Sequence, residues 1–289
     1  MKEDLSNSWK LWQECLFEDD NNSVFSQISN MVWDAAIFHL ILESWQIQNR
    51  KHIGLPGLNN RLQMFINWNF FAAQATSIRR LIDSHKIRGT KSAYSLRGLI
   101  NDIRKQREKL TRETFLGLQE LPYDCSSASN HPDQGIWIDI GEAHKRFDKL
   151  SGRDPNHRSR ADIFSETIFD ELNNKLVSCS HIKDYVDKYI AHASTPESRL
   201  LDNFKEVDIT LRQIWKAQQD LYQVAYFLSS SLFSRGFSPL PLEPYDLFET
   251  AGIPVIDTNR VSEYEKVWKK YRDETESWRT DAETDVYFN

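Results

Sequence analysis

Apolar residues recur at intervals of three and four along most of this chain, which is the period of an amphipathic α-helix. The clearest run extends from Val24 to Leu42, directly after Asn22 and Ser23, two residues that favour a helix start. The pattern predicts helices over 5–19, from 24 to a break at 53–60, over 61–86, from Ser92 or Ser95 onward, and over 137–152, 161–177, 181–193, about 200–233 and about 259–277.

No segment alternates polar and apolar residues as a set of strands would, and Gly 10 and Pro 9 are few for 289 residues. An all-α fold is therefore predicted. Its interior breaks are expected at IGLPGLNN, residues 53–60, and at the turn-like stretch from Pro122 to Gly135. Gly152 and Gly236 are expected to end the helices that precede them.

The distribution of proline along the chain indicates the domain organisation. Four of the prolines lie between Ser238 and Asp257, and this segment is predicted to run extended. We predict one helical domain over 1–236, with its core at about 22–235. The extension over 237–289 is predicted to contain this Pro-rich segment, a C-terminal helix and an acidic tail.

Composition narrows the class of protein. Hydrophobic residues make up 40% and charged residues 27%, which is ordinary for a folded globular chain. The three cysteines form no CxxC pair, so neither a disulfide framework nor a zinc site is predicted. The start of the chain is polar and acidic, and no run of about 18 apolar residues occurs. We therefore expect a cytoplasmic protein with no membrane segment, no metal and no cofactor.

Charge is distributed unevenly. The net charge is -6, but the segment from Arg79 to Glu113 holds eleven basic and four acidic residues, a local charge of +7. Such a segment is typical of a surface that binds phosphate groups. The alternative is a solvated helix face that acidic parts of the chain neutralise after folding.

Two segments carry a resemblance to a known family. They are SIRRLIDSHKIRGTKSAYSLRGLI, residues 77–100, and HIKDYVDKYIAHASTPESR, residues 181–199. The first resembles the Arg-Leu-x-Asp helix end, basic link and Ser-Leu-x-x-Leu helix start of abortive-infection HEPN proteins. The second resembles the signature helix of that family, which is written Arg-Asn-Lys-x-x-Ala-His.

The signature is matched residue by residue with one departure. Asp187 stands at the Asn position, and Lys188, Ala191 and His192 stand at the Lys, Ala and His positions. Val186 occupies the position of the catalytic arginine. The resemblance implies an all-α, up-and-down HEPN-like bundle with additional helices and the Pro-rich C-terminal extension.

The resemblance also implies a function in bacterial anti-phage defence or toxicity, with RNA binding and metal-independent RNA cleavage by a homodimer. Under this hypothesis His192 transfers protons, and Lys188, one α-helical turn earlier, supplies the cation for the phosphate. Asp187 completes the candidate catalytic set. The alternative hypothesis, which rests on Val186, is a non-catalytic HEPN scaffold or a partner of another protein of a defence operon.

The candidate RNA-binding residues all lie in the basic segment. They are Arg79, Arg80, Arg97, Arg104, Lys105 and Arg107. Arg80 and Asp83 are three residues apart at a helix end, so a local ion pair is the simpler interpretation for them. His144 and Asp148 form another polar pair at helical spacing, to which the sequence assigns no role.

Overall fold

The computed structural model describes most of the chain, namely residues 2–17, 22–51, 60–90, 92–124, 136–191, 209–237, 262–263, 265–270 and 272–273. In these ranges the regular elements are helices, and a single isolated β-bridge joins Thr111 to Ile163. The all-α prediction is therefore confirmed. The chain divides into two compact units, residues 1–240 and 241–289, and the described part of the second unit is helical.

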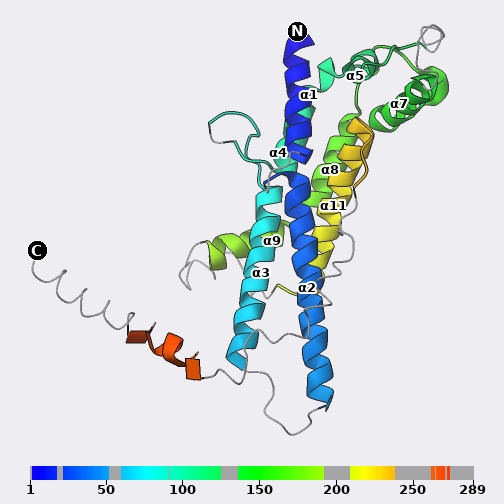
Figure 1. The fold of residues 1–289 in the computed structure, drawn as a ribbon. Coiled ribbons are helices and arrows are strands. Elements are labelled where there is room, and N and C mark those ends of the chain that lie inside the picture. The colour runs from blue at the N-terminus through cyan, green and yellow to red at the C-terminus, as the bar shows by residue number, and fades with distance from the viewer. Residues whose placement is uncertain are drawn as a thin grey trace, which may run out of the picture. The chain divides into compact units, whose positions relative to one another are not determined.

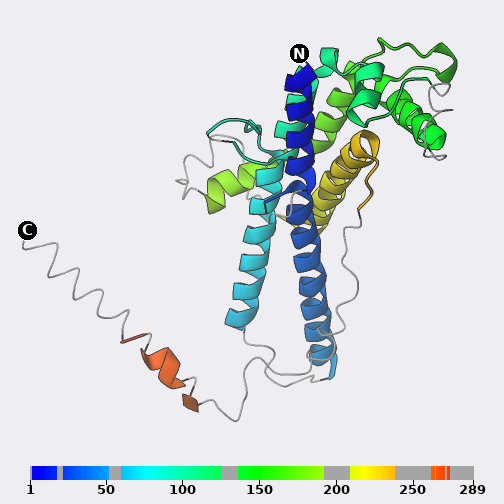
Figure 2. The same cartoon turned by 45° about the horizontal axis from the view of Figure 1, so that its top comes forward.

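The first unit contains long helices and several short ones (Figure 1). In chain order they are α1 (Lys2–Phe17), α2 (Val24–Lys51), α3 (Asn60–Ile82), α4 (Leu96–Lys105), η1 (Arg107–Lys109), α5 (Arg112–Leu118), α7 (Ile136–Ser151), η2 (Pro155–His157), α8 (Glu166–Val177), α9 (Ser180–Tyr185), η3 (Val186–Ile190) and α11 (Leu211–Phe233). In both views α2 and α3 lie side by side, and α11 packs against both of them (Figure 2). Helix α9 lies against α3, and α8 lies against α4 and α11.

The core is one large cluster of buried apolar side chains. Nearly every helix contributes side chains to it. Examples that are fully buried are Trp12, Ile78, Leu99, Phe147 and Leu221. A smaller cluster, in which the rings of Phe38 and Phe70 stack at 3.8 Å, joins α2 to α3 further along. Each of these helices therefore buries the apolar stripe that the sequence predicts.

Buried amides fasten the central three helices together. The side chains of Gln74 in α3 and Gln218 in α11 both donate to the carbonyl oxygen of Met31 in α2, at 3.1 and 3.3 Å. Gln218 also donates to Gln74 Oε1 at 2.7 Å. Because these amides satisfy one another, their burial fixes the register of the three helices without leaving polar atoms unpaired.

Local capping sets several helix boundaries. Ser95 caps α4 by accepting from the backbone N–H of Gly98, and Thr210 forms a capping box with Gln213 at the start of α11. The helix predicted over about 200–233 begins at Leu211 within the described residues, since 209 and 210 are not helical, and residues 200–208 lie outside the described part of the chain. Its end at Phe233 agrees with the prediction, but Ser234, with φ 54°, and not Gly236 takes the left-handed position at the C-cap.

Other elements also differ from the sequence-based prediction, and the helix predicted over 61–86 ends at Ile82. Helix α8 begins at Glu166 and not at 161, because the backbone at Arg160 and Asp162 accepts hydrogen bonds from Glu113 and Arg112. The helix α5 was not predicted, since its seven residues are too few to show a helical period. The C-terminal part of the Pro122–Gly135 loop and the Pro-rich segment lie outside the described residues.

The signature segment departs from α-helical geometry. The α-helix predicted over 181–193 is α-helical only in α9, and η3 continues it as a π-helix in which the Ala191 N–H donates to Val186 O at 2.7 Å. A π-helical turn is wider than an α-helical one, and such turns are frequent at functional sites. Lys188 lies within this π-helix and not in an α-helical turn. Residues 192–200, which include His192, lie outside the described residues.

No helix in the described ranges is long and apolar enough to span a bilayer.

Candidate nucleic-acid interface

The two segments that carry the family resemblance meet in the folded chain. The last turn of α3 packs against α9 and η3, and Arg79 Nε donates to Asp187 Oδ1 at 2.5 Å. Lys183 Nζ donates to the other carboxylate oxygen of Asp187 at 2.9 Å. Burial raises the pKa of Asp187, but the hydrogen bonds from Lys183 and Arg79 outweigh burial and hold the pKa below its usual range. Asp187 is therefore an ionised partner of two cations that join α3 to α9 and η3.

The other described signature positions serve the fold. Val186, at the position of the family arginine, is 2% exposed and belongs to the core. Lys188 is half-buried and already has an interaction partner within the fold. Replacing Val186 by arginine would place a guanidinium in the core, so this change cannot test for catalysis without disturbing the fold.

Several arginines of the basic segment bind acidic groups of the same chain. Arg104 forms ion pairs with Glu166 and with Asp170, the latter at 3.1 Å. Arg107 Nε donates to the carbonyl oxygen of Phe164 at 2.5 Å and lies 3.5 Å from Glu166. These contacts fasten α4 and η1 to the start of α8. The charges of both arginines are therefore neutralised within the fold.

Arg88 and Asp102 form a second internal pair. Two guanidinium nitrogens of Arg88 donate to the Asp102 carboxylate at 2.8 and 2.9 Å, and Trp12 Nε1 donates to it from α1 at 2.8 Å. Burial raises the pKa of Asp102, but the hydrogen bonds from Arg88 and Trp12 lower it further than burial raises it. The ionised carboxylate thus ties the link after α3 to both α1 and α4.

Arg112 is the most deeply buried cation of the segment. Its side chain is fully buried, donates to Asp162 at 3.1 Å and Asp148 at 2.7 Å, and lies 4.6 Å from the centre of the Phe147 ring. It also donates to the backbone oxygen of His144 at 3.2 Å. The His144–Asp148 pair thus holds Arg112 in the core. Arg112 is unavailable to an external phosphate.

Both partners of Arg112 on α7 have shifted pKa values. Burial raises the pKa of Asp148, but hydrogen bonds from Arg158 and Arg112 lower it more. Burial lowers the pKa of His144, against the opposing effect of its Nε2 hydrogen bond to the carbonyl oxygen of Tyr123 at 3.0 Å. A neutral imidazole that donates from Nε2 fits this position.

The remaining candidate cations differ in exposure. Arg80 and Lys105 are exposed, as is Lys86 in the link between α3 and α4. Arg97 is half-buried. Burial raises the pKa of the Cys179 thiol, and the charge of Arg97 is close enough to lower it partly. Lys109 is exposed as well, but it lines neither of the two hollows that Arg80, Lys86 and Lys105 line.

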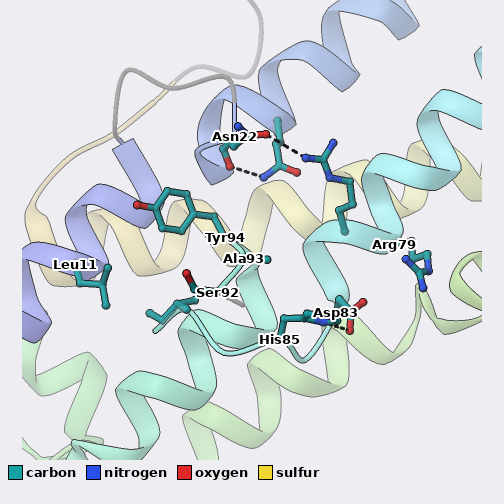
Figure 3. Close-up of a pocket in the computed structure, with 11 residues that line it drawn as sticks. Leu11, Asn22, Arg79, Asp83, His85, Ser92, Ala93 and Tyr94 are labelled. Carbon is teal, nitrogen blue, oxygen red and sulfur yellow. Dashed lines mark hydrogen bonds and ion pairs between the residues drawn. The ribbon is translucent and has the colours of Figure 1, made fainter. Parts of the chain in front are cut away.

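These three cations surround two adjoining hollows. The first, here the Tyr94 cavity, has a volume of about 610 Å³ and lies between Asn22, the end of α3 and link residues 92–94 (Figure 3). The second, here the Lys105 groove, has a volume of about 440 Å³ and lies between link residues 84–88 and the face of α4. His85 lines both hollows, and its imidazole is largely exposed.

The predicted Arg80–Asp83 ion pair does not form. Arg80 Nη2 instead donates to Asn22 Oδ1 at 3.1 Å, and Asp83 Oδ1 lies 3.0 Å from His85 Nδ1. Asp83 also accepts from the backbone N–H of Ser84 at 2.8 Å, which keeps its carboxylate at the end of the helix. Arg80 is thus directed toward the start of α2 and the Tyr94 cavity.

No family model, curated protein or solved structure matches this chain. In the described part of the chain, no group of three or more His, Cys, Asp and Glu side chains is placed to hold a metal ion.

The residues Gln27, His85, Lys86 and Tyr94 contribute to this surface but are not among the site residues that the sequence predicts. Lys86 counts toward the +7 charge of the basic segment, but nothing in the sequence separates it from the arginines that fold inward. His85 follows a helix end, where the sequence gives no sign that two hollows meet. Gln27 lies on the first turns of α2, and its role depends on a contact with Asn22 that only the folded chain reveals.

Proposed function

We propose that this chain is an RNA-binding protein of the HEPN type, with a role in bacterial anti-phage defence, and that it acts by binding RNA and not by cleaving it. The observation that carries the proposal is the placement of charge. Arg88, Arg104, Arg107 and Arg112 are held by carboxylates of the fold, whereas Arg80, Lys86 and Lys105 are exposed around the two hollows.

Single-stranded RNA is the nucleic acid that suits such a surface. Lysine and arginine neutralise backbone phosphates, and hollows beside them admit bases that are not stacked in a duplex. Tyr94 adds an aromatic ring at the first hollow, a residue type on which bases stack. The combination supports binding of a flexible single strand over recognition of a rigid helix.

Binding without cleavage is supported by the described signature positions. A cation is needed to stabilise charge on the phosphate in the transition state. The family supplies it with arginine, but Val186 belongs to the core here, and Asp187 is occupied by Arg79 and Lys183.

Reversing the two lysines of the Lys105 groove tests the proposal. Lys86→Glu combined with Lys105→Glu should weaken binding of a single-stranded RNA oligonucleotide at least tenfold, because two cations become anions. The slope of log affinity against log salt should also fall by about 1.4, since each phosphate contact on a single strand contributes about 0.7. Fluorescence anisotropy at several salt concentrations measures both quantities.

The matched control reverses two exposed lysines elsewhere, Lys145 in α7 and Lys175 in α8. It should change affinity by less than the groove variant, although the net charge of the two proteins is the same. Equal losses in both variants, or no RNA binding by the parent at low salt, would refute the proposal.

In the same samples the RNA should stay intact in chelator. Cleavage that His192→Ala abolishes would instead support the nuclease hypothesis.

A homodimer is part of the proposal. The exposed side chains of Met64, Phe65 and Trp68 near the start of α3 are apolar and lie within a few residues of one another, which supports their burial against a second copy. Light scattering at micromolar concentration should give about twice 33.9 kDa. Phe65→Asp combined with Trp68→Asp should give the mass of one chain, and a monomeric parent would contradict this part of the proposal.

A further inference from the structure

The wall of the Tyr94 cavity contains a buried hydrogen-bond acceptor that lacks a partner. Gln27 is 7% exposed, and its Nε2 donates to the backbone oxygen of Asn22 at 2.6 Å. Because a carbonyl oxygen can only accept, this bond fixes which end of the amide is which. Gln27 Oε1 is then buried with no hydrogen-bond partner. Buried polar atoms of this kind are rare in folded proteins, so a donor supplied by a ligand is an economical explanation.

The rest of the wall offers groups of complementary chemistry. Arg80 is exposed, and the one hydrogen bond that its guanidinium makes with described residues goes to Asn22. Figure 3 shows Asn22, Tyr94 and Ser92 around the cavity, with Asp83 and His85 joined by an ion pair, whereas Arg79 lies apart from them. The cavity thus combines a cation, an aromatic ring and a buried acceptor with the Asp83 carboxylate.

We infer that the Tyr94 cavity binds one nucleotide. Its phosphate would pair with Arg80, and an amino, imino or hydroxyl donor of the base or ribose would satisfy Gln27 Oε1. The base would lie beside Tyr94, and ribose hydroxyls can donate to the Asp83 carboxylate. A cavity of about 610 Å³ is within the usual size range of small-molecule sites.

Two ligands have this chemistry, namely a free nucleotide and a single nucleotide within an RNA strand. The RNA source rests on the proposed function, whereas the free nucleotide does not. In the RNA case the strand would continue from the cavity past His85 into the Lys105 groove, because His85 lines both.

Calorimetry with the full chain separates the sources. The probes are adenosine 5′-monophosphate, uridine 5′-monophosphate, the two nucleosides, inorganic phosphate and a single-stranded RNA hexamer. A nucleotide or the hexamer should bind more tightly than nucleoside or phosphate alone. Arg80→Gln and Gln27→Met should each weaken that binding about tenfold or more. Arg153→Gln, which changes an exposed arginine outside the cavity, should have no effect.

The outcomes distinguish this inference from the proposed function. Mononucleotide binding that both variants weaken identifies the free nucleotide, and binding of the hexamer alone that both weaken identifies a unit of RNA. A third outcome is that the Lys86→Glu, Lys105→Glu protein loses hexamer binding while Gln27→Met leaves it unchanged. This result would overturn the cavity site but would still support RNA binding by the exposed cations. Binding of no probe would overturn both.

A second variant tests the cavity independently of any effect of Gln27→Met on folding. Gln27→Met changes a buried residue, so its helix content should be checked by circular dichroism. Ser92→Trp changes an exposed residue of the cavity wall and fills the cavity without altering Gln27. It should abolish nucleotide binding, and unchanged binding in a folded Ser92→Trp protein would also overturn the inference.

Discussion

Replacing Arg112 by methionine is expected to destabilise the folded protein by about 3–5 kcal/mol. Methionine fills a similar volume but leaves the Asp162 carboxylate, 6% exposed, without its main cation. Asp148 keeps Arg158, whose guanidinium donates to it at 2.6 Å, so the cost comes chiefly from Asp162. A loss of this size is a large part of the stability of an ordinary domain.

The measurement is the free energy of unfolding from denaturant titration of the parent and the variant. The matched control is Arg160→Met, because Arg160 also pairs with two carboxylates, Glu113 and Asp124, but is about half exposed. Exposed pairs contribute about 0–1 kcal/mol. Similar losses for the two variants would contradict the view that Arg112 is a structural cation.

Replacing Trp12 by alanine should cost about 3–5 kcal/mol, since Trp12 is fully buried and its removal leaves a cavity in the core. Its indole also donates to Asp102, the carboxylate that holds Arg88 and the link after α3. Trp12→Phe keeps much of the packing and removes this hydrogen bond. We expect it to cost about 1.5–3 kcal/mol, the usual contribution of a hydrogen bond to a charged group.

Denaturant titration again measures these losses, with Trp137→Ala as the control because Trp137 is an exposed tryptophan of α7. That control should stay within about 0.5 kcal/mol of the parent. If Trp12→Ala costs no more than Trp137→Ala, α1 does not belong to the core as described. In that case α1 does not help to hold Asp102, the carboxylate that binds Arg88 of the link.

The helices could be predicted from sequence because their causes are local. The apolar period from Val24 and the cap at Ser95 depend on neighbours a few residues away, and both appear in the structure. The short α5 and the π-helical turn at η3 could not be predicted. The first is too short to show a period, and the second depends on how α9 and η3 pack against α3.

The candidate site was predictable only in outline. Sequence identifies the basic segment, but it cannot tell a cation that faces solvent from one that an acidic residue binds after folding. Arg104 and Lys105 are adjacent in the chain, and yet Glu166 and Asp170 bind the first while the second lines an open groove. These acidic partners lie more than sixty residues further on, so only the tertiary structure brings them to α4.

We expect RNA to lie against the exposed cations between the end of α3 and the end of α4. Ultraviolet crosslinking of the parent protein to single-stranded RNA, followed by mass spectrometry of the crosslinked peptides, tests this placement. We predict that the crosslinked residues fall between Arg80 and Gln106, with Tyr94 and His85 among them. Crosslinks that cluster instead on α7, α8 or residues 241–289 would contradict the claim.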